Sequence, residues 1–184
     1  MAGLSIFRSF AKSERFYRAR WTLAALFCIS LGAAALGKSD PWPNCHGTNP
    51  EARITACTKI LARGSKETKR NQIAAYINRS SAYRAMGDLD RAMADLGQVL
   101  RRDPKSPLAL TKRASIYQEK GDFDRAITDY TAAIAVRPKS AAAFHGRGEA
   151  YRAKGDLDRA IADFDRELRL DKNLAAAYVG RAKA

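Results

Sequence analysis

Two cysteines and a histidine lie close together in the N-terminal third of the chain, at Cys45, His46 and Cys57. These residue types bind zinc, but a structural zinc site needs four ligands and no convincing fourth ligand accompanies them. Residues 50–63 carry apolar side chains at helical spacing, which places Cys57 on the inner face of a helix and Cys45 in the loop before it. The sequence therefore favours a Cys45–Cys57 disulfide over a metal site.

Carboxylates and histidines are the other residues that could do chemistry, as general acids, general bases or members of a catalytic triad. The histidines are His46 and His145, and neither stands in a pattern with a nucleophile. Glycine-rich phosphate loops are also absent from the sequence. Many acids recur in turns, where they suit the first amides of a helix: Asp88, Asp90, Asp122, Asp124, Asp156 and Asp158. The sequence predicts neither an enzyme nor a bound cofactor.

The elements that carry these acids repeat along the chain. The string GDLDRA begins at Gly87 and at Gly155, and GDFDRA begins between them at Gly121, so the period is 34 residues. A fixed period of this length is typical of a repeat architecture. It divides the chain into units 73–106, 107–140 and 141–174, followed by a partial fourth unit, 175–184.

Each unit has the pattern of two amphipathic helices. In the second unit, Leu110, Ala114 and Tyr117 recur at helical spacing before the turn at Gly121. A second apolar stripe follows the turn and ends before Pro138. A single helix pair cannot bury its apolar face alone, so consecutive pairs are expected to stack into a solenoid.

This pattern resembles the tetratricopeptide repeat family in its period, turns, small residues and closing prolines, Pro104 and Pro138. The resemblance implies an all-α fold: a right-handed α-solenoid of three helix–turn–helix repeats over 73–174, with an N-terminal capping helix. Residues 38–72 would form that disulfide-stapled cap and a polar linker. Residues 175–184 would be a partial fourth repeat or a frayed C-terminal cap. Glu167 departs from the pattern by replacing a small residue, and is expected to loosen the contact after the third repeat.

The resemblance also implies a concave groove, lined by the first helix of each repeat, that holds a peptide or a partner helix. By position, its lining would be Ile77, Asn78, Ser81, Arg84, Thr111, Lys112, Ser115, Gln118, His145, Glu149 and Arg152. One subgroup of the family binds C-terminal carboxylates through a Lys and an Asn, but Ile77 and Ser81 occupy those places here. Arg84, Lys112 and Arg152 would instead anchor an acidic or extended peptide.

The N-terminal 37 residues have the pattern of a secretory signal peptide. Five basic residues precede an uncharged stretch, 21–36, and small residues follow at its end. Sixteen residues are fewer than the roughly 20 that span a bilayer as a helix. An uncleaved inner-membrane anchor over 21–36 remains the alternative. Removal of residues 1–37 would leave Cys45 and Cys57 as one pair in an oxidising compartment.

The net charge of +14 first suggests a nucleic-acid partner. Four of these charges belong to residues 1–37, and within the repeats the signs alternate along helix faces. No basic stripe with interleaved aromatics is present, which disfavours nucleic acid. The sequence thus predicts a non-catalytic, periplasmic or secreted scaffold of a bacterial envelope that binds another protein. A membrane-anchored assembly factor facing the periplasm is the alternative.

Overall fold

The computed structural model describes residues 40–171 and 175–184 of the 184-residue chain. The predicted targeting segment, 1–37, lies outside the described residues. Within the described part, secondary structure is helical throughout: α2 Trp42–His46, α3 Pro50–Leu61, the 3-10 turn η1 Gly64–Lys66, α4 Lys69–Ala85, α5 Leu89–Arg102, α6 Pro107–Glu119, α7 Phe123–Val136, α8 Ala141–Ala153, α9 Leu157–Leu170 and α10 Ala175–Lys183. None of these helices is long and apolar enough to cross a membrane.

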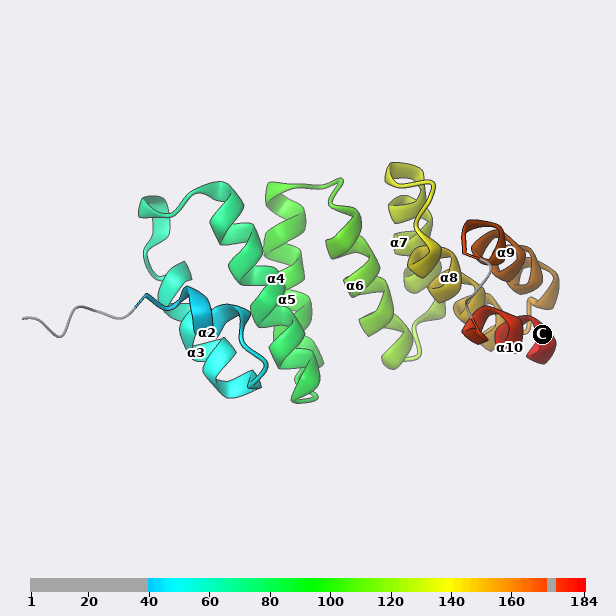
Figure 1. Ribbon diagram of the computed structural model, residues 1–184, viewed down its shortest axis with the longest axis horizontal. Helices are drawn as coiled ribbons and strands as arrows, with labels where there is room; N and C mark the ends of the chain where they lie inside the picture. The colour runs from blue at the N-terminus through cyan, green and yellow to red at the C-terminus, as the bar shows by residue number, and fades with distance from the viewer. Residues whose placement is uncertain (1–39, 172–174) are drawn as a thin grey trace, which may run out of the picture. The chain divides into compact units, whose positions relative to one another are not determined.

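Helices α4 to α9 form three antiparallel pairs that follow one another in chain order (Figure 1). Each pair consists of the two helices that the sequence predicts for one 34-residue unit. Buried alanines allow the paired helices to approach closely, and Ala92, Ala126 and Ala160 are completely buried in the second helix of their pairs. The all-α solenoid predicted from the sequence is confirmed.

The turn between the helices of each pair is built by one glycine and one aspartate. Gly87, Gly121 and Gly155 have φ between 75° and 78°, a left-handed conformation that favours glycine. The following aspartates cap the second helices, as Asp88 does by accepting a hydrogen bond from the Arg91 amide at 2.9 Å. This capping bond and the Arg91 side chain lower the pKa of Asp88. Three of the recurring acids, Asp88, Asp122 and Asp156, are therefore helix caps, and the other three lie in the first turns of the same helices.

A buried ion pair ties the two helices of every pair together. In each, an arginine of the first helix donates its Nε and Nη2 hydrogens to both carboxylate oxygens of an aspartate 16 residues later. Arg113 and Asp129 are joined at 2.6 and 2.8 Å, and Asp129 is only 6% exposed. Such a two-bonded pair fixes both the distance and the register of the helices.

The N-terminal cap differs from the prediction in two places. Cys45 lies in the short helix α2 and not in a loop, because Pro41 and Trp42 start a turn in which the Cys45 amide bonds to the Pro41 carbonyl at 3.0 Å. The polar linker is also shorter than expected. Helix α4 begins at Lys69 because the Thr68 hydroxyl caps it, accepting from the Asn71 amide at 3.1 Å.

Helix α10 packs against α9 at the C-terminal end of the described chain (Figure 1). Ala177 and Gly180 form its buried side. A Cβ atom at Gly180 would lie 2.8 Å from the Phe164 ring, so glycine permits α10 to approach α9 this closely. Residues 175–183 therefore form an ordered, docked helix.

Candidate functional site

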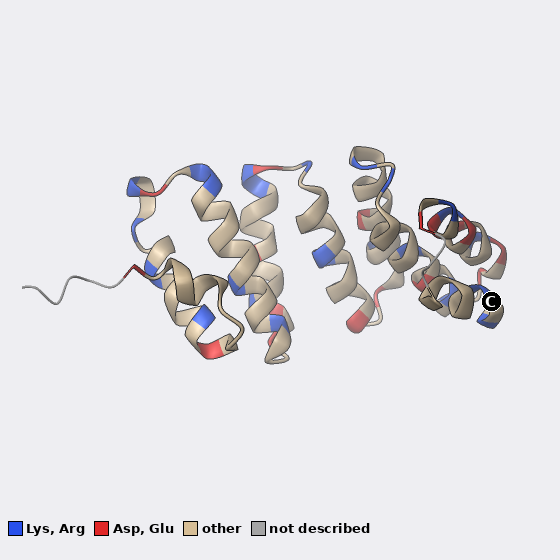
Figure 2. Ribbon diagram, in the orientation of Figure 1, with Lys and Arg blue, Asp and Glu red and all other residues tan. Residues whose placement is uncertain are grey.

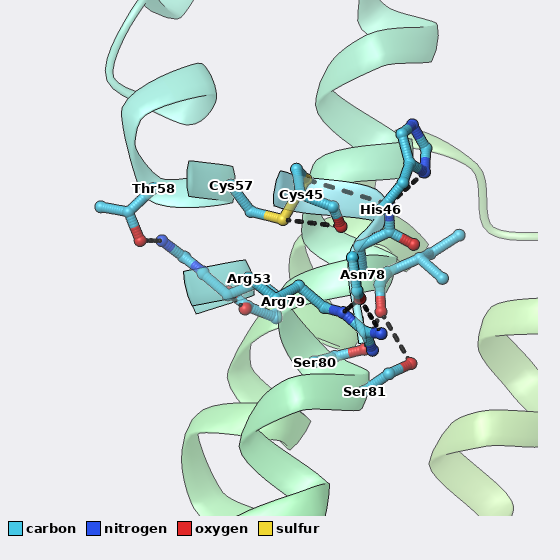
Figure 3. Close-up of a disulfide and its surroundings, with 12 residues drawn as sticks. Cys45, His46, Arg53, Cys57, Thr58, Asn78, Arg79, Ser80 and Ser81 are labelled. Atoms are coloured by element: carbon cyan, nitrogen blue, oxygen red, sulfur yellow. Dashed lines mark hydrogen bonds and ion pairs between the residues drawn. A yellow bond between two sulfur atoms is a disulfide. The ribbon is translucent and has the colours of Figure 1, made fainter. Parts of the chain in front are cut away.

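A disulfide joins Cys45 of α2 to Cys57 of α3 (Figure 3). Both cysteines are fully buried and pack with Ala56, Ile60 and Ala75. In the ranges 40–171 and 175–184, no cluster of three metal-binding side chains exists. The structure thus forms the disulfide that the sequence favours.

The neighbourhood of the disulfide also contains a predicted groove residue. The Asn78 side-chain amide on α4 lies 3.2 Å from His46 Nδ1, next to the disulfide (Figure 3). His46 in turn stacks on Trp42. The Asn78 side chain therefore contacts His46 of the N-terminal cap.

A cavity of about 340 Å³ opens between the first helices of the first two pairs, α4 and α6. Its walls combine an apolar floor with a charged rim. The lining residues are Ser80, Ser81, Arg84, Ala85, Leu96, Lys112, Ile116 and Glu119. Of the residues predicted for the groove, the structure thus brings Ser81, Arg84 and Lys112 together in one cavity.

Lys112 is the half-buried cation of this cavity. Its ammonium donates a hydrogen bond to the Ser81 hydroxyl at 3.0 Å, and that hydroxyl donates a hydrogen bond to the Ile77 carbonyl. Burial lowers the pKa of Lys112, and the nearby Arg84 and Arg53 guanidiniums lower it further. Within the described residues Lys112 forms no salt bridge. An incoming carboxylate would therefore gain a partly desolvated cation without first breaking an ion pair.

Arg84 and Glu119 form the rim of the same cavity. Arg84 Nε donates to Glu119 Oε1 at 2.6 Å, and both side chains are more than a third exposed. An ion pair this exposed contributes little to stability. Arg84 can therefore exchange Glu119 for a ligand carboxylate at small cost.

A separate chain of hydrogen bonds links α6 to α7 and α8. The Tyr130 hydroxyl donates to Gln118 Oε1 at 2.6 Å, and the Gln118 amide donates to the Gly146 carbonyl at 3.2 Å. Burial raises the pKa of Tyr130 to about 12, an effect that Arg84 opposes and Glu119 reinforces. The Gln118 side chain is thus held by hydrogen bonds to α7 and α8.

Gly146→Ala is expected to lower the free energy of unfolding by about 1–3 kcal/mol, the usual cost of overpacking a core. A Cβ atom at this position would overlap the Tyr130 ring, which must then leave its hydrogen bond with Gln118. Urea denaturation measures the effect. Gly97→Ala is the matched control, because this helical glycine has no neighbouring atom within 4 Å of a Cβ. That control should stabilise by up to about 1 kcal/mol, and equal behaviour of the two variants would contradict the packing described.

Comparison with known proteins agrees with this architecture. One tetratricopeptide repeat family model matches residues 111–175, and a second matches residues 83–128. Together the matches run from the end of α4 to the start of α10. The chain belongs to the tetratricopeptide repeat family. A search of curated protein sequences found no match.

Solved tetratricopeptide repeat structures resemble the chain as well. The first such domain of Spaghetti (RPAP3), bound to the HSP90 peptide SRMEEVD, is 28% identical, covering 60% of this chain and 88% of its own, with a TM-score of 0.59. The second domain of human RPAP3, in complex with the HSP70 peptide SGPTIEEVD, is 26% identical, covering 59% of this chain and 90% of its own, with a TM-score of 0.57. A tetratricopeptide repeat protein from Parabacteroides merdae is 25% identical, covering 73% of this chain and 52% of its own, with a TM-score of 0.65.

The remaining predicted groove residues of this tetratricopeptide repeat protein lie outside the α4–α6 cavity. Ile77 packs on the apolar cluster around Leu96. The Thr111 and Ser115 hydroxyls donate to backbone carbonyls of their own helix, those of Pro107 and Lys112. On α8, Glu149 and Arg152 pair with each other at 2.7 Å. Arg152 Nε is buried without a hydrogen-bond partner in the described chain.

His145 and Glu167 correct one expectation from the sequence. Glu167 is 3% exposed, and its carboxylate lies 2.9 Å from His145 Nδ1 on the preceding helix. The His145 ring also packs near Phe164, with ring centroids 5.9 Å apart. Glu167 therefore contacts His145 within the third repeat and does not point towards what packs after it.

Sequence reasoning missed several of the residues that line the cavity. Leu96 is on a second helix, and Ile116 and Glu119 lie on α6 outside the positions carried over from the family. Glu119 stands 35 residues after Arg84, one more than the repeat period. That offset, with opposite charges, is the signal that could have identified the pair.

Proposed function

We propose that this tetratricopeptide repeat protein is a non-catalytic interaction scaffold that binds an extended, acidic segment of another protein in the cavity between α4 and α6. The observation that carries the proposal is Lys112, half-buried in that cavity and hydrogen-bonded to the neutral Ser81 hydroxyl. Arg84 adds a second cation at the rim. Together they favour a ligand that brings carboxylates.

The peptides held by similar structures support an acidic ligand. SRMEEVD and SGPTIEEVD both carry carboxylate side chains near their C-termini. In this chain Ile77 and Ser81 stand where the family's terminal-carboxylate clamp has Lys and Asn. We therefore infer that side-chain carboxylates, and not the C-terminal carboxylate, are the groups that Lys112 and Arg84 recognise.

Three peptides separate these possibilities: SRMEEVD, its C-terminally amidated form, and SRMQQVN. In SRMQQVN, called the neutral form below, neutral amides replace the three acidic side chains. The first two should bind the protein with similar affinity, and the neutral form more weakly. Lys112→Gln should weaken binding of SRMEEVD about tenfold, since a charge-assisted hydrogen bond to a carboxylate is lost. Calorimetric titration measures each affinity.

Lys105→Gln is the matched control, because this exposed lysine before α6 carries the same charge outside the cavity. It should leave the affinity within a factor of two or so, the size expected for a distant surface charge. Equal binding of the acidic and neutral peptides, or equal loss in both lysine variants, would count against the α4–α6 cavity.

The distribution of charge argues against a nucleic-acid partner. Figure 2 shows basic and acidic residues interspersed over the helices. Many of the cations are already paired, as Lys120 is with Asp90 at 2.7 Å and Lys154 with Asp124. Paired cations release few counterions when they meet phosphate, so they contribute little affinity for nucleic acid.

We further propose that the scaffold works in the bacterial cell envelope, exported by residues 1–37 to the periplasm or beyond. The signal pattern and a buried disulfide, which persists in oxidising compartments, support this location. N-terminal sequencing of the exported protein tests it. A start at Leu36 or Lys38 supports cleavage, whereas an intact N-terminus in the membrane fraction favours the alternative, an inner-membrane-anchored assembly factor that keeps residues 21–36.

A further inference from the structure

Helix α10 repeats the pattern of the first helices but is covered differently. Tyr178, Arg181 and Ala182 stand 34 residues after Phe144, Arg147 and Gly148, and 68 after Leu110, Arg113 and Ala114. Leu110 and Ala114 are 6% and 0% exposed, in one cluster with Ala126 and Tyr130 of α7. Tyr178 is 47% exposed, and Ala182 is exposed as well.

The difference arises because, in the described residues, no helix takes the place on α10 that α7 takes on α6. The contacts of α10 are with α9 and α8, which lie on its other side. Three neighbouring side chains, Tyr178, Arg181 and Ala182, thus form what we call the α10 face. Their counterparts in the earlier repeats all serve to bind a second helix.

Arg181 shows which chemistry is missing from the α10 face. It donates from Nη1 to Asp165 of the preceding helix at 3.0 Å, just as Arg147 donates from Nη1 to Thr131 at 3.0 Å. Arg147 also binds Asp163 of its own second helix through Nε and Nη2. Within the described residues, the Nε and Nη2 atoms of Arg181 have no such carboxylate.

We propose that the α10 face binds an amphipathic helix of another protein that carries an aspartate between small and bulky apolar residues. The three second helices define this chemistry. Each presents a small residue, then Asp three positions later, then a bulky residue at the next position, as in Ala126, Asp129 and Tyr130 of α7. The bulky residue would cover Tyr178 and Ala182, and the aspartate would accept both free donors of Arg181.

We assign the α10 face to a different protein and not to a second copy, because the matching helices among the described residues are already engaged. Asp95, Asp129 and Asp163 are each 4–6% exposed and are bound by Arg79, Arg113 and Arg147. A second copy could offer such a helix only by unfolding a repeat. This interface is separate from the α4–α6 cavity and does not depend on the peptide proposed for it.

The probe is a capped peptide with the sequence of residues 122–137, which contains α7 with its aspartate cap. It should bind the full-length protein saturably in fluorescence anisotropy. Arg181→Gln should weaken binding about 5- to 10-fold, as should Asp129→Asn in the peptide, and the two changes together should cost no more than either alone. Arg181→Asp should recover affinity for a peptide that carries Asp129→Arg.

Two control variants separate recognition from disturbed folding. Lys183→Gln removes the same charge from the last turn of α10 and should leave binding unchanged. Asp165→Asn removes the contact that holds Arg181 to α9, so a loss of binding caused by undocking of α10 would appear there too. Amide hydrogen exchange of residues 175–183 reports docking in each variant.

Several outcomes would overturn the proposal. These are no binding of the peptide, equal binding by wild type and Arg181→Gln, and equal losses in Arg181→Gln and Asp165→Asn. A fourth is self-association in sedimentation that Arg181→Gln abolishes, which would assign the α10 face to a second copy. Loss of binding in Lys112→Gln but not in Arg181→Gln would place the peptide in the α4–α6 cavity instead.

Discussion

Asp129→Asn should lower the free energy of unfolding by about 3 kcal/mol, because it leaves the Arg113 guanidinium without its charge partner in a largely buried site. Asp129 is 6% exposed and accepts both hydrogen bonds of Arg113. The asparagine amide would also turn a donor towards one of the Arg113 donors. Urea denaturation followed by circular dichroism measures the change.

The control for this prediction is Asp124→Asn on the same helix. Asp124 is 80% exposed at its side chain and pairs with Lys154 at the surface. Its replacement should change stability by less than about 1 kcal/mol, as is usual for exposed ion pairs. The apolar double variant Arg113→Met with Asp129→Leu should recover most of the loss, since neither charge then remains buried alone. Similar effects of the two single variants would contradict the role given to the buried pair.

These arginine–aspartate pairs also show where sequence reasoning reached its limit. The turn chemistry was predictable because it is local: Gly121 and Asp122 act within a few residues of themselves. The ion pair joins residues 16 apart whose distance depends on how two helices cross. Arg113 and Asp129 both recur with the 34-residue period, so the signal was present. Pairing them required the packing of the helices.

The candidate site likewise contains residues that were predictable from the sequence and contacts that depend on how the helices pack. Ser81, Arg84 and Lys112 were predictable from position, because the repeat places the first helices of adjacent pairs side by side. Asn78 was predicted for the groove, but the structure places it against His46 of α2, a contact that depends on how α2 packs on α4. The departure from the repeat pattern at Glu167 is explained only by its contact with His145, which depends on how α8 and α9 pack.

Reduction of the Cys45–Cys57 disulfide should lower the free energy of unfolding by about 3 kcal/mol. The two cysteines are 12 positions apart, and closing a loop of this size restricts the unfolded chain by about that amount. The N-terminal cap should lose most of this stability, because α2 has only five residues and packs on α3 and α4 through the buried Cys45. Thermal unfolding with and without reductant measures the shift.

The double variant Cys45→Ala with Cys57→Ala separates the cross-link from other effects of the reductant. Its stability should not respond to reductant, and it should lie near or below that of the reduced wild type, because two buried sulfur atoms are also lost. Thiol titration adds an independent check. The unfolded, oxidised full-length chain should show one free thiol, Cys28, and the reduced chain three. Three free thiols before reduction would contradict the Cys45–Cys57 disulfide. A melting temperature that reductant leaves unchanged would contradict its stabilising role, because a cross-link that constrains the unfolded chain must stabilise the cap whenever it is present.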